Sequence, residues 1–311
     1  MKTSCRICFI GIGSIAKRHI RNLRQIACED GFSLTIDAVR HQPSTDIPGG
    51  VDNVFHDFDK IGKYDAIFIT NPTEFHLDTL NRVRDKATAF FIEKPIASAR
   101  QLTIAERDAL ADAPFCYVAC PLRYKKVIQQ LREIITEHTV RGVRCLCSSY
   151  LPDWRPNQDY RETYSAQKVL GGGVSTDLIH EWDYLRFLFG MPNNVFALLG
   201  KKSALEIDTE DTALYVAEYT DKFLELHLDY FGRHTIRECM LFTDDDTIVA
   251  DLVNNQITFL KENRTMEFAE ERDDFQKSEL RHFLQIMEGT PSASTIREAV
   301  QTTRLTQGMI D

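Results

Sequence analysis

The first 120 residues alternate between short apolar runs and longer amphipathic segments. Short apolar runs bounded by turn residues are typical of buried parallel strands, and the segments between them have helical spacing. The predicted strands are Cys5–Ile10, Leu34–Val39, Asp65–Thr70, Ala89–Ile92 and Phe115–Ala119. The predicted helices are Ile15–Cys28, Glu74–Lys86 and Ser98–Ala111. This alternation predicts an α/β domain built on a doubly wound parallel sheet.

After residue 120 the pattern changes. A helix over Leu122–His138, a strand over Val143–Tyr150 and a helix over Ser175–Phe189 are followed by successive strands without helices between them. Those strands are Val195–Leu199, Thr212–Tyr219, Phe223–Tyr230, Thr235–Phe242, Thr247–Leu252 and Gln256–Leu260, and the closing helices are Asp274–Gly289 and Thr295–Met309. Such a run predicts an open, mostly antiparallel sheet. We therefore expect one domain at 1–120 and a second α/β domain at 121–311.

Composition and charge argue against a nucleic-acid-binding, membrane-spanning or zinc-binding protein. The 311 residues are 43% hydrophobic and 27% charged, with a net charge of -9, which argues against a nucleic-acid or anionic-membrane surface. The apolar runs are far shorter than a bilayer needs, and the N-terminus lacks a signal-peptide layout. Cys5 and Cys8 have the spacing of half a zinc site, but no second ligand pair answers them. We expect reduced thiols, no metal and a cytoplasmic protein.

The turn after the first strand is rich in glycine, with the sequence Gly11-Ile12-Gly13-Ser14-Ile15-Ala16. Gly11 permits a tight turn, Gly13 lets the backbone approach a pyrophosphate, and the following helix N-terminus offers N–H groups. This strand–turn–helix context indicates a Rossmann dinucleotide-binding domain in which Gly11, Gly13, Ser14 and Ile15 contact the cofactor. The alternative is a glycine turn without a ligand.

The end of the second strand bears on the choice of cofactor. An acidic residue at this place commonly binds the adenosine ribose 2′-hydroxyl, whereas here Arg40 follows the strand and Asp37 lies inside it. A cation suits a 2′-phosphate, so we expect NADP to be favoured over NAD. The alternative is a solvated arginine.

Three further motifs point to one family. In chain order they are Thr70-Asn71-Pro72-Thr73 followed by His76, then Glu93-Lys94-Pro95, and then Gly171-Gly172-Gly173 followed by Asp177, His180 and Asp183. Together with the glycine fingerprint they resemble the glucose–fructose oxidoreductase / inositol dehydrogenase / MocA (Gfo/Idh/MocA) family over nearly the whole chain. The resemblance implies a sugar, inositol or nucleotide-sugar oxidoreductase with a Rossmann domain and a C-terminal α/β domain whose open sheet makes subunit contacts.

The resemblance also implies roles for individual residues. Lys94 would lie near the nicotinamide and the reacting oxygen, while Asp177 and His180 would face the substrate. Cofactor contacts would come from Thr70, Asn71, Pro72, His76, Glu93 and Lys94. Hydride transfer requires a proton to move at the oxygen, and either Lys94 or His180 has a suitable ionisation range. The alternatives are a solvated Lys94 and a purely structural His76.

The motif helix departs from the usual family spacing. Asp177 and His180 are three residues apart instead of four, which resembles a one-residue deletion. Helical spacing places Asp177, His180, Glu181 and Tyr184 on one polar face, and Leu178, Trp182, Leu185 and Phe189 on an apolar stripe. The alternative reading makes Asp177 a helix cap and His180 a surface residue.

Two other segments are candidates for substrate contacts. Arg123 and Tyr124 follow the last Rossmann strand, and Arg123 either holds an anionic group or forms a salt bridge at the helix start. A Pro-, Tyr- and Arg-rich loop contains Trp154, Arg155 and Tyr164, whose rings and guanidinium suit a nucleotide sugar or acidic sugar. The loop resembles a subgroup found with surface-polysaccharide biosynthesis, and the alternative is a packed interface loop.

Three functions remain in competition. The first is an NADP-favouring sugar dehydrogenase or reductase that forms a homodimer or homotetramer through the C-terminal sheet. The second is a dinucleotide-binding sensor without turnover, and the third is an enzyme that uses bound cofactor transiently, as in redox-assisted glycoside cleavage. Steady cofactor turnover separates the first from the others.

Overall fold

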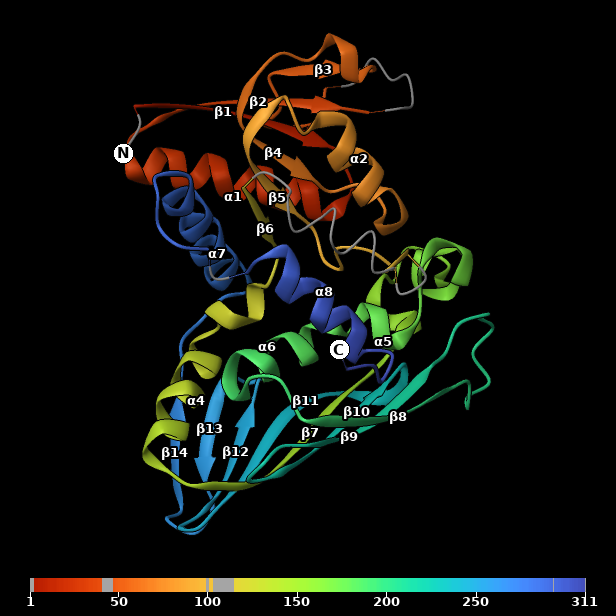
Figure 1. The fold of residues 1–311 in the computed structure, drawn as a ribbon, viewed down its shortest axis with the longest axis vertical. Helices are drawn as coiled ribbons and strands as arrows, with labels where there is room; N and C mark the ends of the chain where they lie inside the picture. The colour runs from red at the N-terminus through yellow and green to blue at the C-terminus, as the bar shows by residue number, and fades with distance from the viewer. Residues whose placement is uncertain (1–2, 41–46, 99–100, 103–114, 293, 311) are drawn as a thin grey trace. The chain divides into compact units, whose positions relative to one another are not determined.

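Figure 1 shows the computed structural model, which describes residues 3–40, 47–98, 101–102, 115–292 and 294–310. The chain divides into two compact units. One comprises Met1–Pro121 with Arg272–Val300, and the other Leu122–Glu271 with Gln301–Asp311. Most of the predicted helix Ser98–Ala111 lies outside the described residues.

The first unit contains a parallel six-stranded sheet in the order β3-β2-β1-β4-β5-β6. Its strands are β1 (Ser4–Ile10), β2 (Ser33–Val39), β3 (Asn53–Phe55), β4 (Tyr64–Ile69), β5 (Ala87–Ile92) and β6 (Cys116–Val118). Its helices include α1 (Ser14–Asp30), α2 (His76–Val83) and α7 (Arg272–Met287). The strand order reverses direction at β1, where ligands of doubly wound sheets bind beyond the carboxyl ends of the strands.

Stacked aromatic rings hold the sheet and α7 together in this unit. Phe9, Phe68 and Phe91 occupy one register across β1, β4 and β5, with ring centroids 4.7 and 4.6 Å apart. Phe283 of α7 packs edge-on against Phe68 and Phe91 at 5.4 and 5.3 Å. Burial of such large rings stabilises the unit through lost water contact and favourable ring geometry.

The second unit contains an eight-stranded sheet in the order β14-β13-β12-β11-β7-β10-β9-β8. The strands are β7 (Val140–Tyr150), β8 (Asn194–Gly200), β9 (Thr212–Glu218), β10 (Phe223–Asp229), β11 (Phe231–Thr243), β12 (Thr247–Asp251), β13 (Gln256–Phe259) and β14 (Arg264–Glu267). Among the described strands of this second sheet, only β7 and β10 pair in parallel. Helices α4 (Lys126–Glu137), α5 (Val174–Asp177) and α6 (Ile179–Phe189) lie over one face (Figure 1), and α8 spans Ile296–Leu305.

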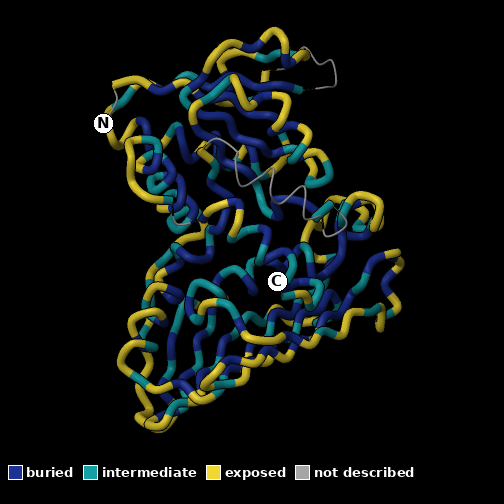
Figure 2. Tube along the Cα trace, in the orientation of Figure 1, coloured by how far each residue is buried: buried dark blue, intermediate teal, exposed yellow. Residues whose placement is uncertain are grey.

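The predicted fold class is confirmed, with differences at helix starts. The predicted helices at Glu74 and Leu122 each begin with a 3₁₀ turn, at Thr73–Phe75 and Pro121–Tyr124. The predicted helix Ser175–Phe189 is broken at Leu178, where φ is -92° and ψ is 22°. The short strands β3 and β14 were not predicted, because their three and four residues carry little hydrophobic pattern. Figure 2 shows mostly buried strands in the first sheet, whereas the strands of the second sheet also carry many exposed and half-buried residues.

Candidate active site

The glycine turn between β1 and α1 is in close contact with the end of β4. Gly11 has a φ of +93°, and a Cβ atom there would lie 2.8 Å from the Asn71 Cα atom. The Thr70 Oγ1 hydroxyl donates a hydrogen bond of 2.8 Å to the Gly11 carbonyl. Glycine is therefore required at residue 11 both for its backbone conformation and for this close approach.

The N-terminus of α1 is open to an anion. Gly13 is the N-cap residue, no side chain caps the helix, and its first turn carries no acidic residue. A Cβ atom at Gly13 would meet nothing within 4 Å in the described part of the chain. Ser14 is exposed and Ile15 is half-buried. The first N–H groups and the positive end of the helix dipole thus lie where a phosphate can reach them.

Arg40 lies directly after β2, as predicted, and its backbone N–H donates to the Phe55 carbonyl at 3.0 Å. Asp37 is buried within the strand. Its carboxylate accepts hydrogen bonds of 2.8 Å from both the Tyr64 hydroxyl and the Asn53 side chain. The carboxylate of Asp37, the acidic residue within β2, is therefore already hydrogen-bonded inside the protein, and the residue that follows β2 is the cation Arg40.

His76 connects the ends of β4 and β5. Its ring nitrogens lie 2.9 Å from the Pro95 carbonyl oxygen and 2.8 Å from the Asn71 carbonyl oxygen. Burial lowers the pKa of His76, against the opposing effect of these two carbonyls, so the neutral ring donates to one of them at a time. The Asn71 amide donates to Thr79, and its Oδ1 atom accepts no hydrogen bond from the described residues. Pro72 is exposed beside it.

Glu93 and Lys94 follow β5, and the Lys94–Pro95 peptide bond is cis. The Glu93 carboxylate lies 2.6 Å from the ring of His19 on α1. Burial alone would raise the pKa of Glu93, but the hydrogen bond and charge of His19, with the charge of Lys94, hold it below its ordinary value. The structure therefore brings the glycine turn, Asn71 and the Glu93-Lys94-Pro95 segment together in the first unit.

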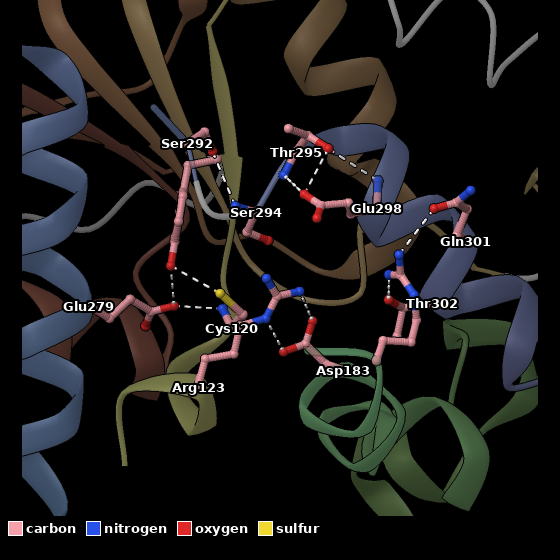
Figure 3. A network of polar contacts seen from close by, with 12 residues as sticks. Cys120, Arg123, Asp183, Glu279, Ser292, Ser294, Thr295, Glu298, Gln301 and Thr302 are labelled. Atoms are coloured by element: carbon pink, nitrogen blue, oxygen red, sulfur yellow. Dashed lines mark hydrogen bonds and ion pairs between the residues drawn. The ribbon is translucent and has the colours of Figure 1, made fainter. Parts of the chain in front are cut away.

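In the second unit Arg123 is buried in a bidentate ion pair. Its Nε and Nη2 atoms donate to the Asp183 carboxylate at 2.9 and 2.7 Å (Figure 3), and the residue is 5% exposed. This pairing corresponds to the salt-bridged alternative raised by the sequence, because it neutralises the guanidinium that would hold an anionic substrate. Tyr124 ends the same 3₁₀ turn and is half-buried.

The triple-glycine turn allows two segments to approach α5. A Cβ atom at Gly172 would lie 2.0 Å from the Tyr164 carbonyl oxygen, and one at Gly173 would lie 2.2 Å from the Glu210 carboxylate. Ser175 donates to the same Glu210 carboxylate at 2.6 Å. These glycines therefore permit the predicted substrate loop and Glu210 to pack directly against the turn.

Asp177 connects that loop to the sheet. The Tyr230 hydroxyl donates to Asp177 Oδ2, and the Trp154 ring packs edge-on against Tyr230 at 5.3 Å. Burial, followed by the charge and hydrogen bonding of Asp177, raises the pKa of Tyr164, and the Arg155 guanidinium lies 6.0 Å from the Tyr164 ring. Trp154, Arg155, Tyr164 and Asp177 thus form one cluster through Tyr230, as a loop contacting the site would require.

The predicted polar face of the motif helix is wrong in three of its four residues, because Asp177, Glu181 and Tyr184 are all buried. Glu181 and Tyr184 are both fully buried, and Glu181 forms an ion pair with Arg237 of β11. The break at Leu178 disrupts the helical spacing, so these side chains pack onto the sheet instead of lining an open face. His180 remains half-buried at the start of α6.

Sequence analysis missed His19, Tyr230 and Glu210. His19 occupies a buried position of α1 among Ala16, Ile20 and Leu23, and a histidine in an apolar stripe was the available signal. Tyr230 directly follows β10, and nothing local relates it to Asp177, which is 53 residues away. Glu210 is brought to Ser175 by a similar long-range contact.

The described residues contain neither a candidate membrane-spanning helix nor a candidate metal site. No helix there combines the length and apolar character needed to cross a membrane. No group of three or more His, Cys, Asp or Glu residues in the described ranges is arranged to hold a metal ion.

A family model and a curated protein both match part of this chain. The GFO/IDH/MocA C-terminal domain model matches residues 128–234. An inositol 2-dehydrogenase of Rhizobium meliloti (strain 1021) is 23% identical over 193 residues, which cover 60% of this chain and 55% of that protein. The chain therefore matches this curated relative over about half of the relative's length.

Three solved structures share the fold along the whole chain. A levoglucosan dehydrogenase in complex with NADH and levoglucosan has a TM-score of 0.84 at 16% identity, covering 98% of this chain and 96% of that chain. A myo-inositol 2-dehydrogenase from Lactobacillus plantarum has a TM-score of 0.76 at 17% identity, covering 98% and 95%. A UDP-N-acetylglucosamine 3-dehydrogenase from Acidithiobacillus ferrooxidans has a TM-score of 0.75 at 19% identity, covering 98% and 96%. The domain match over residues 128–234, the relative and the shared fold together confirm the resemblance to the Gfo/Idh/MocA family that the motifs predicted.

Proposed function

We propose that this protein is an NAD(P)-dependent oxidoreductase that transfers a hydride between nicotinamide and an alcohol or carbonyl of a sugar or nucleotide sugar. The observation that carries the proposal is the convergence of the glycine turn, Asn71 and Glu93-Lys94-Pro95 beyond the carboxyl ends of β1, β4 and β5. That edge of a doubly wound sheet is where dinucleotides bind. The activities of the similar dehydrogenases support the same class of reaction.

The residues present fit a nicotinamide dinucleotide. The uncapped α1 N-terminus at Gly13 would hold the pyrophosphate, and the Asn71 Oδ1 atom would accept a hydrogen bond from a hydroxyl or amide group of the dinucleotide. Thr70, Pro72 and His76 would form the wall along the dinucleotide, with Glu93 and Lys94 nearer the reacting end. When bound, the nicotinamide would accept or donate the hydride.

Lys94 and His180 would move the proton at the substrate oxygen. A side chain for this task should ionise near the working pH, and lysine or histidine can do so in a suitable environment. Lys94 and His180 are both half-buried, and they belong to different units. In this proposal one residue exchanges the proton while the other donates a hydrogen bond to the same oxygen, and Asp177 completes the catalytic set.

The loop carrying Trp154, Arg155 and Tyr164 would contact the substrate, together with Tyr124, whereas the buried ion pair with Asp183 argues against a substrate contact of Arg123. Trp154 and Arg155 are exposed, so they can meet a ligand without rearranging the core. An aromatic face stacks on a sugar ring, and an arginine binds acidic groups. We expect Trp154→Ala and Arg155→Ala each to raise KM for the active substrate, and an unchanged KM in both variants would remove the loop from the site. Surface-polysaccharide synthesis is one pathway class in which such a substrate occurs.

NADP is the proposed preference because Arg40 ends β2 and Asp37 is engaged with Tyr64 and Asn53. We expect Arg40→Ser to weaken NADPH binding by about tenfold, as loss of one charged hydrogen bond would do, while leaving NADH binding nearly unchanged. Calorimetric titration of both nucleotides measures this. If NADH binds more tightly to the parent protein, the preference is wrong although the reaction class stands.

The outer face of the second sheet would join two or more copies of the chain. Phe196 and Leu198 of β8 lie opposite Val216 and Leu214 of β9, and these four side chains are 65%, 72%, 46% and 38% exposed. An exposed apolar patch of paired strand residues is typical of an interface. Leu198→Glu should shift the protein toward monomers in analytical ultracentrifugation, and an unchanged mass would exclude this face as the subunit interface.

The eight cysteines are free thiols, which supports the proposed cytoplasmic setting.

The test of the proposal is steady turnover of nicotinamide. The purified protein is incubated with NADP or NAD and with myo-inositol, levoglucosan or UDP-N-acetylglucosamine, and the absorbance of reduced nicotinamide is followed. The proposal predicts net reduction with a member of this substrate class that is lost in Lys94→Ala. Tight dinucleotide binding without turnover across a wide sugar panel would favour a sensor, and glycoside cleavage without net reduction would favour transient use of the cofactor.

A further inference from the structure

Buried histidines lie on both sides of Lys94. His19 of α1 contacts the Glu93 carboxylate at 2.6 Å, and His76 of α2 contacts the Pro95 carbonyl at 2.9 Å. Each histidine is 1% exposed, whereas Lys94 is half-buried. The His19 ring is itself fixed, because the edge of Phe91 packs against it at 5.2 Å. The residues before and after Lys94 are therefore anchored to two different helices.

The charged groups around Glu93 come from several elements. Helix α1 contributes His19 and Arg18, helix α2 contributes His76, and Lys94 is the next residue in the chain. The charges of Arg272 and Asp273 on α7 also affect the pKa of the Arg18 guanidinium. The second carboxylate oxygen of Glu93 lies 3.3 Å from the Lys94 backbone nitrogen. The pKa of Glu93 is lowered as described above, so at neutral pH its negative charge lies beside the lysine.

We propose that His19 is a positioning residue for Lys94: it holds the Glu93 carboxylate beside the lysine, and that carboxylate sets the orientation and proton affinity of the Lys94 amine. An adjacent negative charge favours the ammonium form, and a carboxylate fixed by a buried donor exerts a constant effect. The inference rests on the proposed function of Lys94 in proton transfer and adds a residue of α1 to the machinery. It also accounts for the presence of a histidine among the buried residues of α1.

The experiment measures the Lys94 amine directly, without substrate or cofactor. Lysines of the full chain are ¹³C-dimethylated, the Lys94 signal is assigned with Lys94→Arg, and its pKa is followed by NMR. We expect Glu93→Gln to lower the Lys94 pKa by about one unit, the lower end of the effect of a neighbouring opposite charge. His19→Leu should shift it in the same direction by a smaller amount. His19→Gln should stay close to the parent value, because its amide can donate from nearly the same position.

His282→Gln is the matched control. It removes a histidine of α7 in the same unit, whose ring packs against Tyr117 at 6.2 Å, and it should leave the Lys94 pKa unchanged. An identical Lys94 pKa in the parent and in Glu93→Gln would overturn the inference, as would equal shifts in His19→Leu and His19→Gln. If Glu93→Gln does not fold, the two His19 variants decide the question alone. Loss of the proposed function would appear separately, as full turnover by Lys94→Ala with the pKa shifts intact.

Discussion

The surroundings of Lys94 in the first unit and of Asp177 in the second are built differently. Around Lys94, short loops at the ends of adjacent parallel strands are tied by contacts to backbone carbonyls, such as those of His76 with Asn71 and Pro95. Around Asp177, a buried carboxylate holds tyrosines from a distant loop and a sheet corner. The first arrangement follows from sheet geometry, whereas the second depends on specific long-range side chains.

Lys94→Ala should give the largest effect on turnover. Loss of a positioned acid or base lowers kcat by about 10³-fold, while dinucleotide affinity should change by less than about threefold. Lys63→Ala is the control, because Lys63 lies in the same unit with its side chain 76% exposed. Steady-state kinetics and calorimetry measure the two quantities. Equal turnover in both variants would remove Lys94 from the chemistry.

Gly11→Ala should mainly lower the stability of the fold, whereas Gly13→Ala should mainly weaken dinucleotide binding. A side chain at residue 11 meets Asn71 at 2.8 Å and forces a strained φ, which should lower the free energy of unfolding by about 2 kcal/mol. At residue 13 the added methyl meets nothing within 4 Å of the described chain, so stability should hold while it crowds the phosphate site. Chemical denaturation and calorimetry test both. A stable Gly11→Ala protein would contradict the close approach.

Tyr230→Phe tests the second region. It removes the donor to the buried Asp177 carboxylate, which should cost about 1–2 kcal/mol in the free energy of unfolding. The loop should also become more open to proteolysis near Trp154, because that ring packs on Tyr230. Tyr219→Phe is a control, since its hydroxyl donates a longer hydrogen bond, of 3.4 Å, to the Gly190 carbonyl. Equal stabilities would show that the Tyr230 bond is not needed.

Glu93→Gln should produce the smallest effect, which should appear as a change in the pH dependence of the free energy of unfolding. Its pKa in the folded protein lies below the ordinary value of 4.5, so its contribution is fully present above that pH and is lost as the pH falls through the folded pKa. The parent should therefore exceed Glu93→Gln in unfolding free energy near neutrality, and the gap should narrow on acidification. Denaturation series from about pH 7 down to pH 3 measure it. A gap that widened in acid would contradict the assigned direction.

The same contrast explains what the sequence could predict. The strands of the first unit and the positions of Gly11, Arg40 and Lys94 follow from apolar runs and turn residues, because parallel strands bring their carboxyl ends to one edge. The sequence does not reveal that α7 packs with β4 and β5, since Phe283 is one more apolar residue in an amphipathic helix.

In the second unit the helical pattern around Asp177 was misleading. Helical spacing assumes an unbroken helix, and the break at Leu178 sends Glu181 and Tyr184 into the sheet core. The ion pair of Glu181 with Arg237 and the bond of Tyr230 with Asp177 join residues more than fifty positions apart. No local pattern encodes such partners, so the site around Asp177 could be only partly predicted.

The most direct test of the account is calorimetric titration of nucleotide-free protein with NADPH and NADH. The account predicts binding of one nicotinamide dinucleotide per chain, tighter for NADPH, and greatly weakened by Gly13→Ala in a protein of unchanged stability. If neither nucleotide binds to folded, nucleotide-free protein, the glycine turn and the strand edge around Lys94 are not a cofactor site, and the proposed oxidoreductase function is contradicted.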